Sequence, residues 1–206
     1  MRRQKLILAT QNPGKAREFR LLLEGIPYEV VSLADLPPCQ LPLESGNSYS
    51  ENAMAKARAV VNAFAAFALG DDSGLEVDAL GGSPGILSAR YGDKGLSSAD
   101  QCRKLLEALS GIPREHRTAR FRSVIALAAP SGTEALTEGV LEGVIAERPV
   151  GEGGFGYDPI FLLPELGLTL AQLDPSSKNR LSHRAKAVAK ARPLLEQWAR
   201  LEARSD

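Results

Sequence analysis

Two adjacent carboxylates, Asp71 and Asp72, follow a mostly apolar run over residues 63–69 and precede a glycine-punctuated segment over residues 75–85. Charged groups are rarely buried unless they are paired or bound to a metal, and neighbouring carboxylates raise each other's pKa. A hard divalent cation such as Mg²⁺, which takes oxygen ligands, would neutralise the pair. The alternative is a surface turn, because Asp-Ser-Gly is ordinary turn chemistry.

A second group of polar residues has the pattern Thr10-x-Asn12-x-x-Lys15, between the first predicted strand and the first predicted helix. Such a junction offers main-chain amides and the positive end of a helix dipole to an anion. Lys15 adds a positive charge suited to phosphate, although the spacing differs from that of a P-loop. An ordinary capped loop is the alternative.

A third group combines Glu44, in an irregular segment, with Glu51, Asn52 and Lys56 at the start of the next predicted helix. Asn52 and Lys56 are four residues apart and therefore share one face of that helix. These residues could act together with the carboxylate pair. Taken in isolation, these residues are better explained as a solvated helix end with ordinary surface charges.

A glycine-rich segment over residues 151–156 formally contains the pattern G-x-G-x-x-G. We reject a dinucleotide site, because that motif should open a helix and residues 157–163 do not have a helical pattern. A loop whose aromatic residue, Phe155, stacks on a base is the preferred interpretation. A plain glycine-rich turn is the competing one.

A basic group lies at and before the last predicted helix, where Lys178 precedes Ser182-His183-Arg184. The start of a helix beside basic side chains suits an anion or the polar edge of a base. In the alternative interpretation Ser182 is an N-cap whose two neighbours are exposed.

The elements that must position these groups follow from apolar spacing and from turn residues. Strands are predicted over residues 5–10, 28–33, 67–71, 117–129, 135–146 and 160–163. Helices are predicted over residues 15–24, 48–64, 97–109 and 182–203. The third strand thus ends at the carboxylates, and the strands on either side of residues 130–133 form an antiparallel hairpin. Early αβ units with a later hairpin predict an α/β fold with a mixed sheet.

Length and composition exclude several classes of protein. The chain has 206 residues, enough for one domain or two small lobes, and a formal net charge of zero. Bulk electrostatics therefore predicts no binding to a nucleic-acid polymer or a membrane surface. The two cysteines, Cys39 and Cys102, are too few for a disulfide framework, which favours a reduced, cytoplasmic protein. No apolar run is long enough to span a bilayer.

Taken together and in this order, the motifs closely resemble those of the inosine triphosphate pyrophosphatase family, also called dITP/XTP diphosphatases. Residues 10–15 match its T-x-N-x-x-K opening, although Gln11 stands where many relatives have glycine. The other matching segments are residues 50–53 with Lys56, 71–85, 88–91, 153–159 and 182–184. The resemblance extends from about residue 5 to about residue 190.

The resemblance implies a single domain over residues 1–206 with an elongated mixed sheet and flanking helices, which form two lobes around an active-site cleft. It also implies a homodimer. The expected activity is Mg²⁺-dependent hydrolysis of non-canonical purine nucleoside triphosphates (ITP, dITP, XTP) to the monophosphate and pyrophosphate. Such an enzyme, a hydrolase acting on phosphoric anhydrides, would clear deaminated purines from the nucleotide pool.

The resemblance further implies a role for each motif. Asp72 would be the base that activates water, Asp71 would support it, and Glu44 with Asp72 would bind Mg²⁺. The substrate-binding residues would be Thr10, Asn12, Lys15, Lys56, Ser73, Phe155, Gly156, Tyr157, Asp158, Lys178, His183 and Arg184. Among these, the three lysines would hold phosphates, Phe155 would stack on the purine, and the segment around Arg184 would read its edge. The rival hypotheses are a pyrophosphatase for other modified nucleotides and a nucleotide sensor without turnover.

Overall fold

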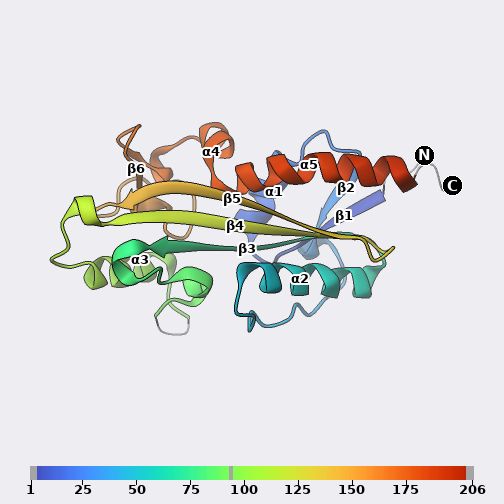
Figure 1. Ribbon diagram of the computed structural model, residues 1–206, viewed down its shortest axis with the longest axis horizontal. Helices are drawn as coiled ribbons and strands as arrows, with labels where there is room; N and C mark the ends of the chain where they lie inside the picture. Colours follow the sequence, from blue (N-terminus) through green and yellow to red (C-terminus); the bar gives the residue numbers. More distant parts are fainter. Residues whose placement is uncertain (1–3, 93–94, 203–206) are drawn as a thin grey trace. The chain divides into compact units, whose positions relative to one another are not determined.

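The computed structural model describes residues 4–92 and 95–202 (Figure 1). The other residues of the predicted domain, including the predicted helix end at Ala203, lie outside the described residues. The strands are β1 (Gln4–Ala9), β2 (Tyr28–Ser32), β3 (Phe67–Val77), β4 (Thr118–Ala128), β5 (Glu134–Ile145), β6 (Phe161–Leu163) and β7 (Leu168–Thr169). The α-helices are α1 (Pro13–Leu22), α2 (Tyr49–Phe64), α3 (Ser98–Ala108), α4 (Pro175–Leu181) and α5 (His183–Glu202). The 3₁₀ turns are η1 (Leu33–Asp35), η2 (Asp78–Leu80), η3 (Gly85–Arg90), η4 (Arg114–His116), η5 (Asp158–Ile160) and η6 (Leu170–Gln172).

The described strands form one mixed sheet with the order β2-β1-β3-β4-β5-β6-β7. Strand β1 pairs in parallel with β2 and β3, whereas β6 pairs antiparallel with β5 and β7. A turn between Ala129 and Thr133 joins the neighbours β4 and β5 into a hairpin. The predicted α/β fold with a mixed sheet and flanking helices is therefore confirmed.

The chain divides into two compact units. Unit 1 takes its described residues from Met1–Asp72, Ser123–Gly139 and Arg184–Asp206, and unit 2 from Ser73–Arg122 and Val140–His183. The strands β3, β4 and β5 contribute residues to both units. The predicted cleft between two lobes stays a prediction, and so does the single domain.

In unit 1 the sheet is covered by helices on both faces, with α5 and α2 on opposite sides of the strands (Figure 1). Successive side chains of a strand point to opposite faces, and β1 shows this clearly. Leu6 and Leu8 pack with α1 and α5, whereas Ile7 and Ala9 pack with α2. All four side chains are at most 1 % exposed, so β1 is buried on both faces.

In unit 2 a separate apolar core forms between α3 and the sheet. Leu105 and Leu109 of the α3 segment pack against Leu75 and Val77 of β3, and all four are fully buried. Tyr157, from the glycine-rich segment, also belongs to this core. The segment is therefore held against a packed layer.

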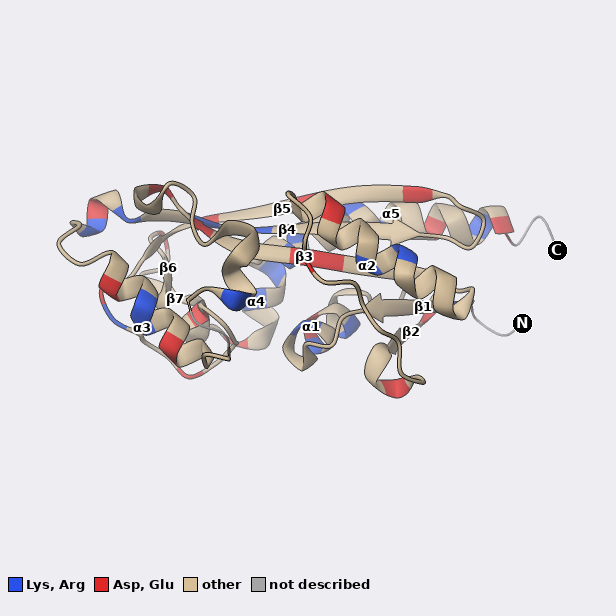
Figure 2. Cartoon of the chain, turned by 90° about the horizontal axis from the view of Figure 1, so that it is seen from below, with Lys and Arg blue, Asp and Glu red and all other residues tan. Residues whose placement is uncertain are grey.

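One predicted strand end is wrong, and one α-helix was not predicted. The strand predicted to end at Asp71 continues to Val77, so the acidic pair lies inside β3 (Figure 2 shows the red stretch partway along that strand). The strand continues because cationic side chains neutralise both carboxylates, as described below. The sequence analysis also missed α4, although Asp174 caps it and Pro175 opens it, which is a common helix start.

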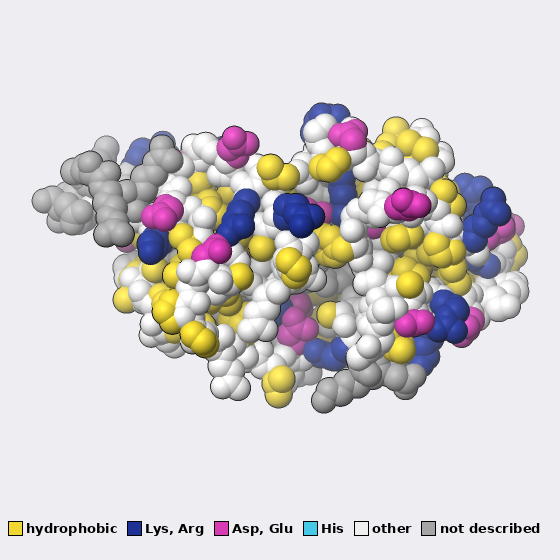
Figure 3. Space-filling model, turned by 180° about the vertical axis from the view of Figure 1, so that it is seen from behind, with side chains coloured by type: hydrophobic (Ala, Val, Ile, Leu, Met, Phe, Trp, Pro, Cys, Tyr) yellow, Lys and Arg dark blue, Asp and Glu magenta, His cyan; other side chains and the backbone are white. Residues whose placement is uncertain are grey.

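Surface charge is mixed over the described residues. Basic and acidic side chains are interspersed on the face seen in Figure 3, in agreement with a formal net charge of zero for the chain. None of the helices in residues 4–92 and 95–202 has the length and apolar character needed to cross a bilayer.

Candidate functional site

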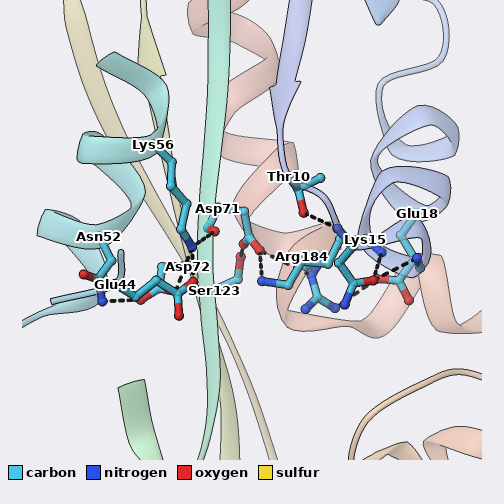
Figure 4. A network of polar contacts seen from close by, with 12 residues as sticks. Thr10, Lys15, Glu18, Glu44, Asn52, Lys56, Asp71, Asp72, Ser123 and Arg184 are labelled. Carbon is cyan, nitrogen blue, oxygen red and sulfur yellow. Dashed lines mark hydrogen bonds and ion pairs between the residues drawn. The ribbon is translucent and has the colours of Figure 1, made fainter. Parts of the chain in front are cut away.

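Asp71 and Asp72 are buried in β3, with exposed fractions of 2 % and 3 %. The surface-turn interpretation is therefore wrong. Because they are successive residues of a strand, their side chains point to opposite faces of the sheet. Figure 4 shows the result, in which each carboxylate has its own set of partners. The two acids do not form one shared cation site.

The Asp71 carboxylate lies between cationic groups of unit 1. One oxygen accepts a hydrogen bond from Ser123 Oγ at 2.7 Å, and the other lies 2.7 Å from Lys15 Nζ. Arg184 Nε is 3.8 Å from that second oxygen, and Arg184 also pairs with Glu18 at 3.0 Å. Two positive and two negative side chains thus alternate here, which compensates the cost of burying each charge.

The Asp72 carboxylate faces helix α2. One oxygen accepts a hydrogen bond from Asn52 Nδ2 at 3.0 Å, and the other lies 3.2 Å from Lys56 Nζ. Lys56 Nζ also donates to the main-chain oxygen of Asp71 at 3.0 Å and to the carboxylate of Glu44. The predicted metal ligands, Glu44 and Asp72, therefore share one ammonium group (Figure 4).

These contacts shift the pKa values of Asp72 and Lys56. Burial raises the pKa of Asp72, and the nearby Glu44 charge adds to this, whereas Lys56 and Asn52 oppose it without reversing it. Burial by itself lowers the pKa of Lys56, but Asp72 and Glu44 outweigh burial, so the pKa of Lys56 is raised. Lys56 therefore stays charged, while Asp72 holds a proton more readily than an exposed aspartate does.

Close packing of α2 against β3 brings these groups together. A Cβ atom at Gly70 would overlap the carbonyl oxygen of Ala53 and lie 3.0 Å from the main-chain nitrogen of Ala57. Only glycine leaves room for the helix backbone at this distance. Asn52 and Lys56, on the same helix face, reach β3 directly after Gly70 for this reason.

The loop before α1 is a capped helix start. The Asn12 side chain accepts hydrogen bonds from the main-chain nitrogens of Gly14 at 2.9 Å and Lys15 at 3.1 Å, and Thr10 Oγ1 accepts one from Asn12 N at 3.2 Å. The capped loop proposed as an alternative is therefore present. It also fixes Lys15 on the first turn of α1, next to Asp71. Binding of an anion by Thr10 and Asn12 stays a prediction.

The residues present fit a hard divalent cation. Glu44 and Asp72 supply carboxylate oxygens, which are the ligands that Mg²⁺ prefers. The described ranges 4–92 and 95–202 hold no group of three or more His, Cys, Asp and Glu residues arranged for a metal. Two carboxylates are enough for Mg²⁺, because it usually keeps several waters and binds substrate phosphates.

In unit 2 the glycine-rich segment presents Phe155 beside a buried ion pair. Lys178 Nζ lies 2.6 Å from Asp158 Oδ2 and 4.7 Å from the centre of the Phe155 ring. The same oxygen of Asp158 accepts a hydrogen bond of 2.8 Å from Phe155 N. A Cβ atom at Gly154, where φ is +72°, would lie 2.8 Å from Asp158 Cγ. The glycine therefore allows the loop to close around the carboxylate.

Two further contacts of unit 2 fix the rest of this loop. Tyr157 is 4 % exposed, and its hydroxyl donates to the main-chain oxygen of Ser88 at 2.9 Å. Burial raises the pKa of Tyr157, so the hydroxyl keeps its proton. Cys102 Sγ lies 3.4 Å from the main-chain oxygen of Gly156, and burial raises the pKa of this thiol to about 11. The loop is thus anchored at the two residues that directly follow Phe155.

The basic group at the start of α5 is buried, so the alternative with exposed neighbours is wrong. His183 is 1 % exposed and stacks on Phe121 with ring centres 4.7 Å apart, whereas Arg184 is 5 % exposed and pairs within unit 1. Ser182 is likewise buried. Ser73 directly follows Asp72 in β3 and is partly exposed. Reading of a base edge by His183 and Arg184 stays a prediction.

Sequence reasoning missed two partners in unit 1. Ser123 lies within β4, where a single serine in an apolar strand carries no distinctive pattern. Glu18 follows Lys15 by three residues, so the two share a face of α1, and this spacing is a signal that was available.

Comparison with known proteins gives consistent matches. Residues 6–194 match the model of the Ham1 family. The chain is 48 % identical over 195 residues to the dITP/XTP pyrophosphatase of Geobacillus kaustophilus, covering 95 % of this chain and 94 % of that protein. A structure of a HAM1 protein from Coxiella burnetii aligns with a TM-score of 0.83 and 37 % identity, covering 94 % and 99 % of the two chains.

A second solved structure, of the nucleoside-triphosphatase / dITP/XTP pyrophosphatase from Mycobacterium abscessus, has a TM-score of 0.73 and 43 % identity. The alignment covers 92 % of this chain and 99 % of that one. The matches span nearly the whole length of each protein, so they concern the complete fold.

Proposed function

The chain belongs to the Ham1 family, and we propose that it hydrolyses the triphosphates of deaminated purines, ITP, dITP and XTP, to the monophosphate and pyrophosphate. Two of the similar proteins carry the name dITP/XTP pyrophosphatase, which supports this reaction class and substrate. The products follow from attack of water on the α-phosphorus. The chain would thereby remove damaged nucleotides from the precursor pool.

The observation that carries the proposal is the cluster of Glu44, Lys56 and Asp72 in unit 1, with Lys15 and Asp71 on the other side of β3. Phosphoryl transfer needs positioning and charge neutralisation more than a protein nucleophile. Two lysines and three carboxylates supply the charges for both tasks. A pure binding module would not need buried acids beside the lysines that are proposed to hold the phosphates.

Asp72 is the proposed base. A general base works best when its pKa lies near the working pH, and burial raises the pKa of Asp72 in that direction. Glu44 and Asp72 would hold Mg²⁺, which supplies neutralisation of the phosphate oxygens when bound. Lys15 and Lys56 would hold the phosphates, and Asp71 would keep Lys15 in place.

The loop around Phe155 is the proposed platform for the purine. The ring offers a flat apolar face, and the anchors at Tyr157 and Asp158 hold it in one orientation. Lys178, whose ammonium group pairs with Asp158, would hold a phosphate group together with the other two lysines. Donors at His183 and Arg184 would bind the oxygen at C6. This oxygen is present in ITP and XTP and replaced by an amino group in ATP.

A reducing, cytoplasmic setting and a homodimeric assembly belong to the same proposal. Cys39 and Cys102 are both free thiols, which is the usual state of cysteine in a reducing compartment. Size-exclusion chromatography with light scattering would test the dimer.

Incubation of the purified chain with ITP and Mg²⁺, followed by phosphorus NMR, tests the reaction. We expect IMP and intact pyrophosphate, and loss of turnover when EDTA removes the metal. Release of orthophosphate without pyrophosphate would refute attack at the α-phosphorus. Tight binding of ITP without any product would instead identify a nucleotide sensor.

A further inference from the structure

The ammonium group of Lys56 uses all of its hydrogen-bonding capacity inside the protein. It donates to Glu44 Oε1, to Asp71 O at 3.0 Å and to Asp72 Oδ1 at 3.2 Å. A lysine ammonium has three donors, so these three acceptors saturate it. In this state Lys56 has no N–H group left for a phosphate.

The same contacts place a positive charge between two acids. The side chains of Lys56, Glu44 and Asp72 are 9 %, 23 % and 4 % exposed, so water screens their charges weakly. Without a cation between them, two carboxylates in such a place would repel each other. The Lys56 ammonium therefore neutralises the carboxylates that are proposed to bind Mg²⁺.

We infer that Lys56 is an internal counter-ion that a divalent cation displaces, and that the displaced ammonium then becomes available to the substrate phosphates. This inference rests on the proposed function, because it takes Glu44 and Asp72 as the metal ligands. The reasoning is that an ammonium donor and a metal ion compete for the same carboxylate lone pairs. The flexible four-carbon stem of lysine allows the group to turn away once it is released.

Lys15 provides the matched comparison within the same network. Its ammonium lies 2.7 Å from Asp71 Oδ2, on the other side of β3 from Glu44 (Figure 4). The positive charge of Lys15 also lowers the pKa of Asp72 through space. Lys15 therefore acts on the proposed metal ligands electrostatically, without a hydrogen bond to Glu44 or Asp72. Replacing Lys15 therefore removes a charge, and replacing Lys56 removes both a charge and a competitor.

Calorimetric titration with Mg²⁺ alone, without nucleotide, tests the competition in the parent and in the variants Lys56→Met and Lys15→Met. We expect Lys56→Met to bind Mg²⁺ at least about tenfold more tightly than the parent, and Lys15→Met to change much less. In EDTA, Lys56→Met should have a lower Tm than the parent, and Mg²⁺ should raise its Tm more. Equal affinities in the parent and Lys56→Met, or no Mg²⁺ binding by either, would overturn the inference.

Lysine ammonium groups in ¹H–¹⁵N NMR spectra give a second test that depends on the parent protein. A buried, fully bonded ammonium gives a persistent signal, which the Lys56→Arg variant identifies by its absence. We expect this signal to be lost at Mg²⁺ concentrations that saturate the parent, and its persistence there would overturn the inference. No nucleotide is present in these experiments, so failure of the pyrophosphate assay and failure of the displacement remain separate results.

Discussion

Gly70 and Ala53 bring strand β3 and helix α2 into direct main-chain contact. A Cβ atom at Gly70 would overlap the carbonyl oxygen of Ala53, and its distance to the carbonyl carbon would be 3.1 Å. Asn52 and Lys56 lie on the face of α2 that makes this contact. Both donate hydrogen bonds to Asp72, two residues beyond Gly70 on β3. The position of the buried charges therefore depends on the absence of one side chain.

Gly70→Ala is expected to destabilise the protein and to abolish most of its activity. The added methyl group must push α2 away from β3, and overpacking of this kind costs about 1–3 kcal/mol of unfolding free energy. The same shift would draw Lys56 away from Asp72. Urea unfolding and initial rates with ITP measure the two effects.

The matched control for this change is Gly81→Ala. Gly81 has a φ of +61° and open space around its Cβ position, so alanine there adds backbone strain without overlap. We expect a stability loss of about 1 kcal/mol and normal turnover. If Gly70→Ala keeps wild-type rates, the contact between β3 and α2 does not set the catalytic geometry.

Asp72→Asn is expected to lose turnover without losing stability in EDTA. The change removes the proposed base, a role that contributes about 10²–10⁴-fold to the rate, and also removes a proposed anionic metal ligand. Because burial raises the pKa of Asp72, the folded protein disfavours the ionised form of this side chain. An uncharged asparagine avoids that cost. Steady-state rates and thermal unfolding test the two statements.

The pH dependence of this stability difference has a definite sign. A raised pKa means that the folded protein binds the Asp72 proton more tightly than the unfolded chain does. The contribution of Asp72 to stability is thus fully present below the ordinary aspartate pKa and is lost as the pH rises through the folded-state value. The Tm of Asp72→Asn relative to the parent should therefore increase from pH 4 to pH 7. A relative Tm that falls over this range would contradict the assignment.

Much of unit 1 could be predicted from the sequence because its signals are local. The residues after Asn12 form a capped helix, and the apolar spacing in α2 marks the face that packs on the sheet. The segment carrying Asp71 and Asp72 was misjudged at its end, since two adjacent charges normally stop a buried strand. The partners that allow β3 to continue come from distant segments, and local patterns do not reveal such pairings.

The same limit explains what was missed in the candidate site. The role of Ser123 as a donor to Asp71 depends on the pairing of β4 beside β3, and the stacking of His183 on Phe121 depends on tertiary packing. Neither contact leaves a periodic signal. The motif residues themselves were found because their joint order along the chain resembles a family, and not because each pattern is distinctive.

Tyr157→Phe is expected to loosen the loop that carries Phe155. The variant removes the 2.9 Å hydrogen bond to the main-chain oxygen of Ser88 and leaves that buried acceptor without this donor. The expected cost is about 1–3 kcal/mol of unfolding free energy. If Phe155 stacks on the purine, KM for ITP should rise while kcat changes little. Urea unfolding and steady-state kinetics measure both, and an unchanged KM would show that the loop does not need this anchor.

Arg184→Ala is expected to narrow the preference for ITP over ATP. Donors at the start of α5 can bond the oxygen at C6 of ITP, whereas the amino group of ATP would leave them unpaired. The variant loses a charged hydrogen bond to ITP, and it also loses the cost of unpaired donors that opposes ATP. Together these changes should lower kcat/KM for ITP about tenfold or more relative to kcat/KM for ATP. Arg184 also pairs with Glu18 at 3.0 Å, so some loss of stability will accompany the change.

The ratio of the two kcat/KM values separates these effects, because both substrates encounter the same destabilised enzyme. Phe155→Ala is the control, since stacking on a purine face is insensitive to the groups at its edge. This variant should lower kcat/KM for ITP and for ATP to the same extent, and should therefore leave the ratio of the two values unchanged. An unchanged ratio in Arg184→Ala as well would mean that Arg184 serves Asp71 and Glu18, its partners in unit 1, and that the edge of the purine is recognised by other residues.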